Sequence, residues 1–80
     1  MEYSGKVAVV TGAGSGIGRG LTQKCGQLGM KVVAGDVDTK GLKVTEDALA
    51  QSGAEVLAVQ TDVTDFSSVA KLADAAYARF

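Results

Sequence analysis

The chain has 80 residues, of which 46% are hydrophobic and 21% charged. A length of 80 residues is too short for a complete nucleotide-dependent enzyme, because a single domain most often has about 100–150 residues. The net charge of −1 and the absence of Trp leave no electrostatic or stacking basis for binding nucleic acid or an anionic membrane. One Cys and no His exclude an intrachain disulfide and a Cys/His metal site, so no metal is expected.

The first predicted strand and helix flank a cluster of glycines. Residues 6–11 form a short β-branched run, which is typical of a strand buried on both faces in a parallel sheet. Residues 16–28 are predicted to be a helix that stops at Gly29, because glycine accepts the left-handed conformation without steric cost. Apolar side chains recur in this helix at helical spacing: Ile17, Leu21, Cys25 and Leu28. Gly20 and Gly26 weaken the helix and could let it pack close to the sheet.

A second strand and helix are predicted over residues 30–35 and residues 39–52. Asp36 ends the strand, and Gly53 closes the helix. Residues 55–60 form the third predicted strand. The second helix carries a weaker stripe on one side: Leu42, Thr45 and Leu49.

Thr64 can cap a last helix that runs to Phe80. Its stripe consists of apolar residues: Phe66, Val69, Ala70, Ala73, Ala76, Tyr77 and Phe80. Strict alternation of strands and helices predicts an α/β fold with parallel strands joined by right-handed crossovers. A crossover helix without a following strand is an unfinished unit, so we expect an N-terminal piece of a longer protein.

The segment TGAGSGIG, from Thr11 to Gly18, joins the first strand to the first helix. Its glycines let the backbone turn sharply, and the helix N-terminus offers N–H groups and a positive dipole end that suit a pyrophosphate. The patterns G-x-G-x-x-G and the P-loop both fail, because Ile17 stands where each needs glycine. The segment does contain G-x-x-x-G-x-G, beginning at Gly12. Taken alone, it could equally be a tight strand-to-helix turn.

Asp36 stands 20 residues after Gly16, at the end of the second predicted strand. With adjacent strands, its carboxylate points at the same crevice as the glycine loop, where it can accept both hydroxyls of an adenosine ribose. The alternative is a strand-end Asp that caps a turn, since Asp38 also follows. Loop, spacing and strand context together favour dinucleotide binding.

These residues resemble the short-chain dehydrogenase/reductase family. The resemblance rests on TGAGSGIG after KVAVV, on Asp36 after KVVAG, and on DVTD at residues 62–65 after EVLAVQ. It covers the chain from about Gly5 to Phe80. It implies a Rossmann-like doubly wound parallel sheet, of which this chain has the N-terminal βαβαβα portion with strand order 3-2-1. Residues 1–80 would then be the N-terminal part of a dinucleotide-binding domain, and the catalytic C-terminal half is absent from this chain.

The resemblance implies NAD as the cofactor and gives roles to matched positions only. The expected cofactor-binding residues are Gly12, Ser15, Gly16, Ile17, Gly18, Asp36, Asp62 and Val63. Asp36 would bind the adenosine ribose, and Asp62 with the Val63 backbone would contact the adenine, while Thr11 would be structural. From the residues alone, Asp62 could equally cap the last helix. NADP is disfavoured because Asp36 would repel its 2′-phosphate, and because Ser15 and Val37 replace the bases that NADP-using relatives often carry.

The chemistry that the resemblance implies is hydride transfer between the nicotinamide and a small alcohol or carbonyl substrate. The family's Asn, Ser and Tyr-x-x-x-Lys cannot be located here, so no catalytic residue is assigned and the 80-residue chain alone is predicted to be inactive. Tyr77 is interpreted as a core residue, and Cys25 as a buried small hydrophobe. Arg19 could reach a phosphate, but a solvated surface position is favoured, since a cation opposes the dipole at a helix N-terminus.

Two functions are therefore weighed. The first is the cofactor-binding half of an NAD-dependent oxidoreductase, with a parent that is a homo-oligomer. The second is a non-catalytic NAD-binding or sensor module. We favour the first, because the sequence halts between a helix and its expected strand. The longest apolar stretch near the N-terminus, residues 7–10, is too short for a signal peptide or membrane span, so a cytoplasmic location is expected.

Overall fold

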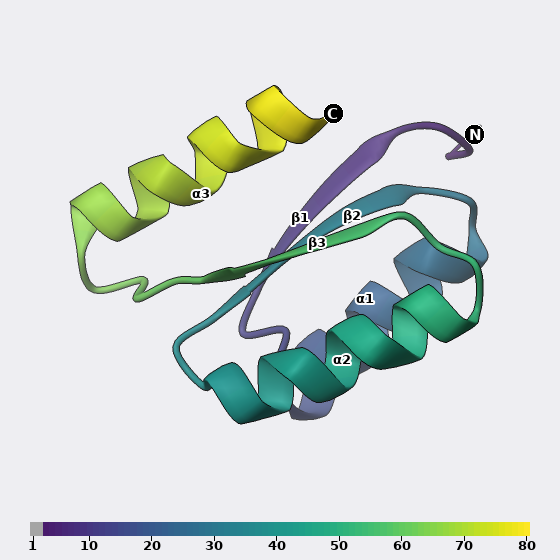
Figure 1. The fold of residues 1–80 in the computed structure, drawn as a ribbon, viewed down its shortest axis with the longest axis horizontal. Coiled ribbons are helices and arrows are strands. Elements are labelled where there is room, and N and C mark those ends of the chain that lie inside the picture. Colours follow the sequence, from purple (N-terminus) through teal and green to yellow (C-terminus); the bar gives the residue numbers. More distant parts are fainter. Residues whose placement is uncertain (1–2) are drawn as a thin grey trace.

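Three strands and three helices alternate in the computed structural model, which describes residues 3–80 (Figure 1). Their bounds are β1 Val7–Thr11, α1 Gly16–Gln27, β2 Lys31–Asp36, α2 Thr39–Gln51, β3 Val56–Gln60 and α3 Phe66–Arg79. All six predicted elements are present, and their ends differ only slightly from the sequence-based ranges. The α/β class is thus confirmed.

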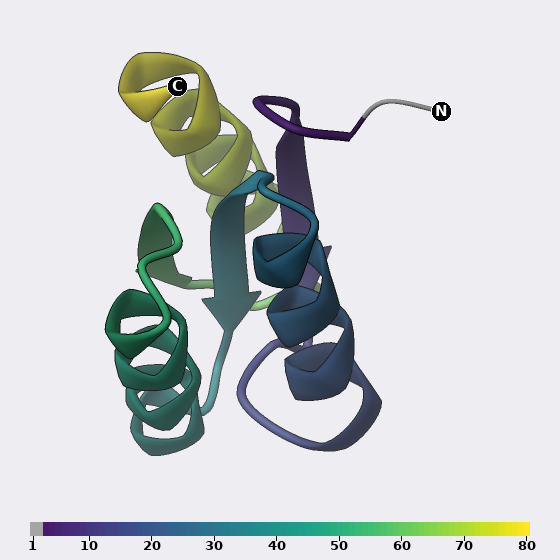
Figure 2. The ribbon, with the colours of Figure 1, turned by 90° about the vertical axis from the view of Figure 1, so that its right-hand side faces the viewer.

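The three strands form one parallel sheet in the order β1-β2-β3, with β2 in the middle. The register aligns Val9 with Val33 and Val33 with Leu57. Helices α1 and α2 pack on one face, and α3 packs on the other face against β2 and β3 (Figure 2). Because the strands are parallel, β1, β2 and β3 all end at the same edge of the sheet.

The centre of the core is β2. Val32, Val33 and Ala34 are fully buried, since this strand has neighbours on both sides and helices on both faces. The expectation of a strand buried on both faces is wrong for β1, where Val7 and Val9 are 42% and 49% exposed. Helix α3 lies over β2 and β3, and so leaves this part of β1 uncovered.

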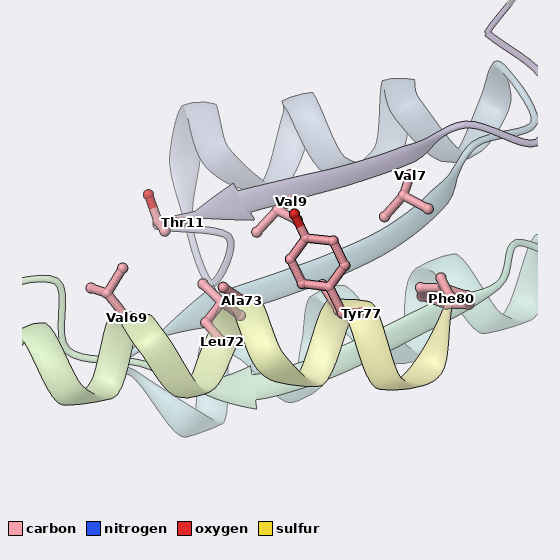
Figure 3. Close-up of a pocket in the computed structure, with 9 residues that line it drawn as sticks. Val7, Val9, Thr11, Val69, Leu72, Ala73, Tyr77 and Phe80 are labelled. Atoms are coloured by element: carbon pink, nitrogen blue, oxygen red, sulfur yellow. The ribbon is translucent and has the colours of Figure 1, made fainter.

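An apolar groove of about 560 Å³ lies between β1 and α3 (Figure 3). Its lining comes from these two elements: Val7, Val9, Thr11, Val69, Leu72, Ala73, Ala76, Tyr77 and Phe80. Leu72 and Ala76 are buried against the sheet, but Phe66 and Tyr77 are 88% and 87% exposed. The interpretation of Tyr77 as a core residue is therefore wrong, because the single helix on this face does not span three strands.

Helix α1 packs through its small residues. Gly18, Thr22 and Gly26 recur every fourth position on its inner side. Thr22 is fully buried, and a Cβ at Gly26 would lie 3.2 Å from the Ala54 Cβ and 3.5 Å from Leu49. The predicted apolar stripe is wrong, since it lies outward: Ile17 is 91% exposed and Leu21 is 52% exposed, while Cys25 is only partly buried. Glycine thus permits close packing at Gly26, but Gly20 faces open space.

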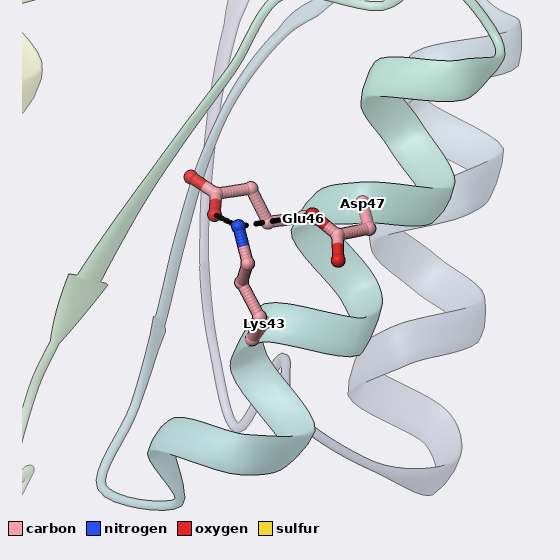
Figure 4. Close-up of polar contacts among 3 residues, drawn as sticks. All are labelled: Lys43, Glu46 and Asp47. Atoms are coloured by element: carbon pink, nitrogen blue, oxygen red, sulfur yellow. Dashed lines mark ion pairs between the residues drawn. The ribbon is translucent and has the colours of Figure 1, made fainter.

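Helix α2 buries the predicted side chains Leu42, Thr45 and Leu49. On its outer face Lys43 forms ion pairs with Glu46 at 3.6 Å and with Asp47 at 3.1 Å (Figure 4). The hydrogen bond to Asp47 is the main reason why the pKa of Lys43 is raised above 10.5. Such exposed pairs contribute little to stability, because water and salt screen them.

The helix ends confirm some capping predictions and correct one. Gly29 and Gly53 follow α1 and α2 with φ values of +80° and +86°, which confirms both as helix stops. The predicted cap at Thr64 is wrong. The N-cap of α3 is Asp65, whose carboxylate accepts a hydrogen bond from the Ser67 N–H at 2.9 Å.

Candidate functional site

The glycine loop, residues 12–15, joins the end of β1 to the start of α1. Gly12 and Gly16 have φ values of +69° and +53°, a region that side-chain-bearing residues rarely adopt. Gly18 is crowded, since a Cβ there would lie 1.9 Å from the Gly12 carbonyl oxygen. The three glycines of the predicted G-x-x-x-G-x-G pattern are therefore required for two different reasons. Gly12 and Gly16 adopt a backbone conformation that favours glycine, and Gly18 has no space for a side chain.

The N-terminus of α1 differs from those of the other two helices. Asp38 caps α2 and Asp65 caps α3 with a carboxylate, whereas Ser15, the N-cap of α1, forms no side-chain capping hydrogen bond. The first turn of α1, like those of α2 and α3, contains no acidic residue, so the difference lies in the cap alone. The N–H groups of this turn thus lack the usual anionic partner from the chain itself, which suits an anionic ligand.

Asp36 lies at the end of β2 and faces the glycine loop, as predicted. Its Oδ2 accepts a hydrogen bond from the Gly14 N–H at 2.7 Å, and its Oδ1 accepts one from the Asp38 N–H at 3.0 Å. The interpretation of Asp36 as a strand-end residue that closes a turn is confirmed by its hydrogen bond from the Asp38 N–H. Its position beside the glycine loop is compatible with ribose binding, which stays a prediction. The hydrogen bond from the Asp38 N–H is the main reason why the pKa of Asp36 lies below 3.8. Partial burial raises this pKa, whereas the N–H groups of Gly14 and Val37 lower it further. The group is a carboxylate at neutral pH.

Asp62 follows β3 at the same edge of the sheet. Its Oδ1 accepts hydrogen bonds from the Thr64 hydroxyl at 2.7 Å and the Thr64 N–H at 2.9 Å, and these lower its pKa below 3.8. Asp62 therefore shapes its own loop and does not cap α3, so that alternative is wrong. Its own N–H donates to the Ser68 hydroxyl at 2.9 Å, which ties the loop to α3. Val63 beside it is 62% exposed.

The expected cofactor-binding residues are mostly accessible. Gly12, Ser15, Gly16, Ile17, Asp62 and Val63 are exposed, whereas Gly18 and Asp36 are partly buried. Val37, next to Asp36, is 62% exposed. The three strand ends bring these segments to one edge of the sheet, although they are far apart in the chain.

Three residues outside the expected cofactor-binding set also build this edge: Gly14, Arg19 and Thr45. A Cβ at Gly14 would lie 2.7 Å from Asp36 Oδ2, so the absent side chain lets the loop contact the carboxylate. The expectation that Arg19 occupies a solvated surface position is wrong. Its Nε donates to the Thr45 hydroxyl at 2.9 Å, and its Nη2 donates to the Gly41 carbonyl oxygen at 3.2 Å and to the Gly14 carbonyl oxygen. The partners are more than 20 residues away in two of these bonds, so no local pattern signals them.

Within residues 3–80, no helix is both long and apolar enough to cross a membrane. The same residues contain no group of three or more side chains that could hold a metal ion.

Comparison with known families matches residues 6–80 to the family described as short chain dehydrogenase. The chain is 44% identical over 79 residues to the 1-deoxy-11-beta-hydroxypentalenate dehydrogenase of Streptomyces avermitilis. This alignment covers 99% of this chain and 29% of that protein. Among solved structures, a short chain dehydrogenase/reductase from Burkholderia phymatum in complex with NAD has a TM-score of 0.93 and 54% identity, over 95% of this chain and 27% of that one.

A metagenomic short-chain oxidoreductase in complex with NADP has a TM-score of 0.89 and 34% identity, over 99% of this chain and 36% of that one. The chain thus spans well under half of the length of each of these proteins.

Proposed function

Because the chain belongs to the short chain dehydrogenase family, we propose that residues 1–80 form the NAD-binding part of an oxidoreductase whose catalytic half follows in a longer protein. The activity is hydride transfer between the nicotinamide and a small alcohol or carbonyl substrate. A cytoplasmic location and a homo-oligomeric assembly belong to the same proposal and rest on the sequence alone.

One observation carries this proposal. The Asp36 carboxylate accepts the Gly14 N–H at 2.7 Å, directly beside a helix N-terminus that has no side-chain cap. A dinucleotide needs these two features together, because its pyrophosphate prefers helix N–H groups and its ribose hydroxyls prefer a carboxylate acceptor.

Each residue of the site has a task in binding. The N–H groups at the start of α1 bind the pyrophosphate, and Gly12 and Gly16 keep the backbone free of side chains at that point. Asp36 accepts the ribose hydroxyls, since each carboxylate oxygen has acceptor capacity beyond its present hydrogen bond. Asp62 and the Val63 backbone border the adenine. The bound cofactor supplies the hydride chemistry.

The charge of Asp36 supports NAD rather than NADP. A 2′-phosphate would lie close to this carboxylate, and two unit charges about 4 Å apart repel by about 4 kcal/mol at an effective dielectric of 20. Ser15 and Val37, which flank the same position, carry no compensating positive charge.

The test is calorimetric titration of the full-length protein with NAD, comparing the unmutated form with Gly16→Val. At a φ of +53° a β-branched residue is strained, so we expect the Kd for NAD to rise at least about tenfold. Gly20→Ala is the matched control, because Gly20 lies in the same helix and its missing side chain would meet open space. An unchanged Kd in Gly16→Val would mean that the loop is only a turn.

The same protein is then tested for oxidation of NADH with a panel of carbonyl substrates. Turnover supports the oxidoreductase, whereas tight NAD binding without turnover of any substrate supports the non-catalytic module.

A further inference from the structure

Ala13 and Gly14 are the most firmly held residues of the glycine loop. Both are buried, and all four of their backbone polar groups are hydrogen-bonded to other segments. The partners come from β2, α1 and α2: the Gly35 carbonyl oxygen, Asp36 Oδ2, the Arg19 guanidinium and the Thr45 hydroxyl. The conformation of these two peptide units is therefore determined by residues outside the loop.

Two of these partners are coupled to each other. The Thr45 hydroxyl accepts from Arg19 Nε at 2.9 Å and donates to the Ala13 carbonyl oxygen at 2.7 Å. The Thr45 side chain is fully buried, so its hydroxyl has no access to water as an alternative partner. Arg19 in turn reaches the Gly14 and Gly41 carbonyl oxygens, and thus joins α1, the loop and α2.

The loop and α2 also touch without any side chain between them. A Cβ at Gly41 would lie 2.2 Å from the Gly14 carbonyl oxygen, so the first turn of α2 approaches the loop at backbone distance. Arg19 donates to both carbonyl groups at this contact. A guanidinium suits this position, because its donors project as a planar fork that can serve several acceptors at once.

We propose that Arg19 and Thr45 are positioning residues for dinucleotide binding, which rests on the function proposed above. They hold the Ala13 and Gly14 carbonyl groups, and so direct the Gly14 N–H at the Asp36 carboxylate. Their effect on the cofactor is indirect and is exerted through the shape of the loop and the orientation of Asp36.

The test uses the full-length protein and measures the Kd and KM for NAD, kcat, and the denaturant midpoint of unfolding. The variants are Arg19→Ala, Arg19→Lys, Thr45→Val and Thr45→Ser, and the control is Lys24→Ala, which removes an exposed cation from the same helix. We expect the Kd and KM for NAD to rise about tenfold in Arg19→Ala and Thr45→Val, while kcat falls far less. Thr45→Val loses a buried hydrogen bond, and Arg19→Ala loses three partly buried ones. Thr45→Ser keeps the hydroxyl and should restore binding to within about twofold.

Arg19→Lys separates geometry from charge. Lysine keeps the positive charge but lacks the fork, so positioning requires that its Kd rise nearly as much as that of Arg19→Ala. Wild-type affinity in Arg19→Lys would overturn the proposal in favour of direct attraction of the phosphates.

The proposal also fails if Thr45→Val binds NAD as tightly as Thr45→Ser, and this comparison remains decisive even if Arg19→Ala does not fold. Failure of the function itself is recognised separately, because then the unmutated protein and Lys24→Ala bind no NAD at all.

Discussion

Asp36 is held from two sides, by the N–H groups of Gly14 and Asp38, and it remains charged at neutral pH. This one carboxylate links the glycine loop to the end of β2. It thereby determines both the local geometry and the sign of the charge that a ligand meets, and two predictions depend on it.

The first concerns the choice of cofactor. In Asp36→Ala combined with Val37→Arg, the repelling carboxylate is removed and a positive charge is added at a site where the side chain is exposed. We expect the ratio of kcat/KM for NADP over NAD to rise by at least about a hundredfold in the full-length enzyme, because about 4 kcal/mol of repulsion is lost. Steady-state kinetics with both cofactors measures it. Equal kcat/KM values in the unmutated enzyme would refute the role of Asp36.

The second concerns acid stability. The pKa of Asp36 is lower in the folded chain than its ordinary 3.8, so the unfolded state binds the proton more readily. Its stabilising contribution is complete above 3.8 and is lost as the pH falls through the lower folded value. Asp36→Asn should therefore flatten the decrease in the free energy of unfolding at acidic pH. Denaturant titrations of both forms over this range measure the difference. Parallel pH profiles of the two forms would show that the hydrogen bonds from the Gly14 and Asp38 N–H groups do not lower the pKa of Asp36.

At the scale of elements, α1 shows how glycines in one helix differ in role. Gly18 and Gly26 lie on the packed side, where a Cβ would approach the Gly12 carbonyl oxygen to 1.9 Å and the Ala54 Cβ to 3.2 Å. Gly20 lies on the outer side with open space around it. The packed glycines allow close approach, whereas Gly20 only weakens the helix.

We therefore predict opposite effects of alanine along this helix. Gly20→Ala should raise the free energy of unfolding by about 0.5–1 kcal/mol, because alanine has the higher helix propensity. Gly18→Ala should destabilise or unfold the chain, since its Cβ cannot fit beside Gly12. Chemical denaturation of the full-length variants measures both. A stability loss in Gly20→Ala would indicate that this side of α1 is covered by another part of the protein.

At the scale of the whole molecule, the two faces of the sheet are covered unequally. In the part of the chain that the structure describes, two helices cover one face, while α3 alone lies on the other and leaves Val7 and Val9 exposed beside the groove. Among residues 3–80, the strand β1 has a neighbouring strand on one side only. An apolar edge strand next to an open groove invites pairing with another chain.

Residues 1–80 expressed alone should accordingly be aggregated, strand-swapped or molten, and should show no reductase activity. Sedimentation, near-UV circular dichroism and an NADH oxidation assay measure this. A monodisperse monomer that unfolds cooperatively would mean that three strands and three helices form a self-sufficient core.

The sequence by itself determined the element order, the helix stops at Gly29 and Gly53, and the neighbourhood of Asp36 and the glycine loop. These features are local or follow from strand order, because apolar periodicity and the conformational freedom of glycine act within a few residues. The family resemblance rests on the same short segments, and the match over residues 6–80 confirms it.

Only the tertiary structure decided which side of α1 faces inward, how much of the α3 stripe is buried, and what Arg19 binds. The apolar stripe of α1 faces outward and Tyr77 is exposed, because burial depends on which face another element covers and not on periodicity alone. Arg19 meets Thr45 across 26 positions in sequence, a contact that exists only after α1 and α2 pack side by side. Its partners are backbone carbonyls and a hydroxyl, which carry no charge pattern that a sequence could display.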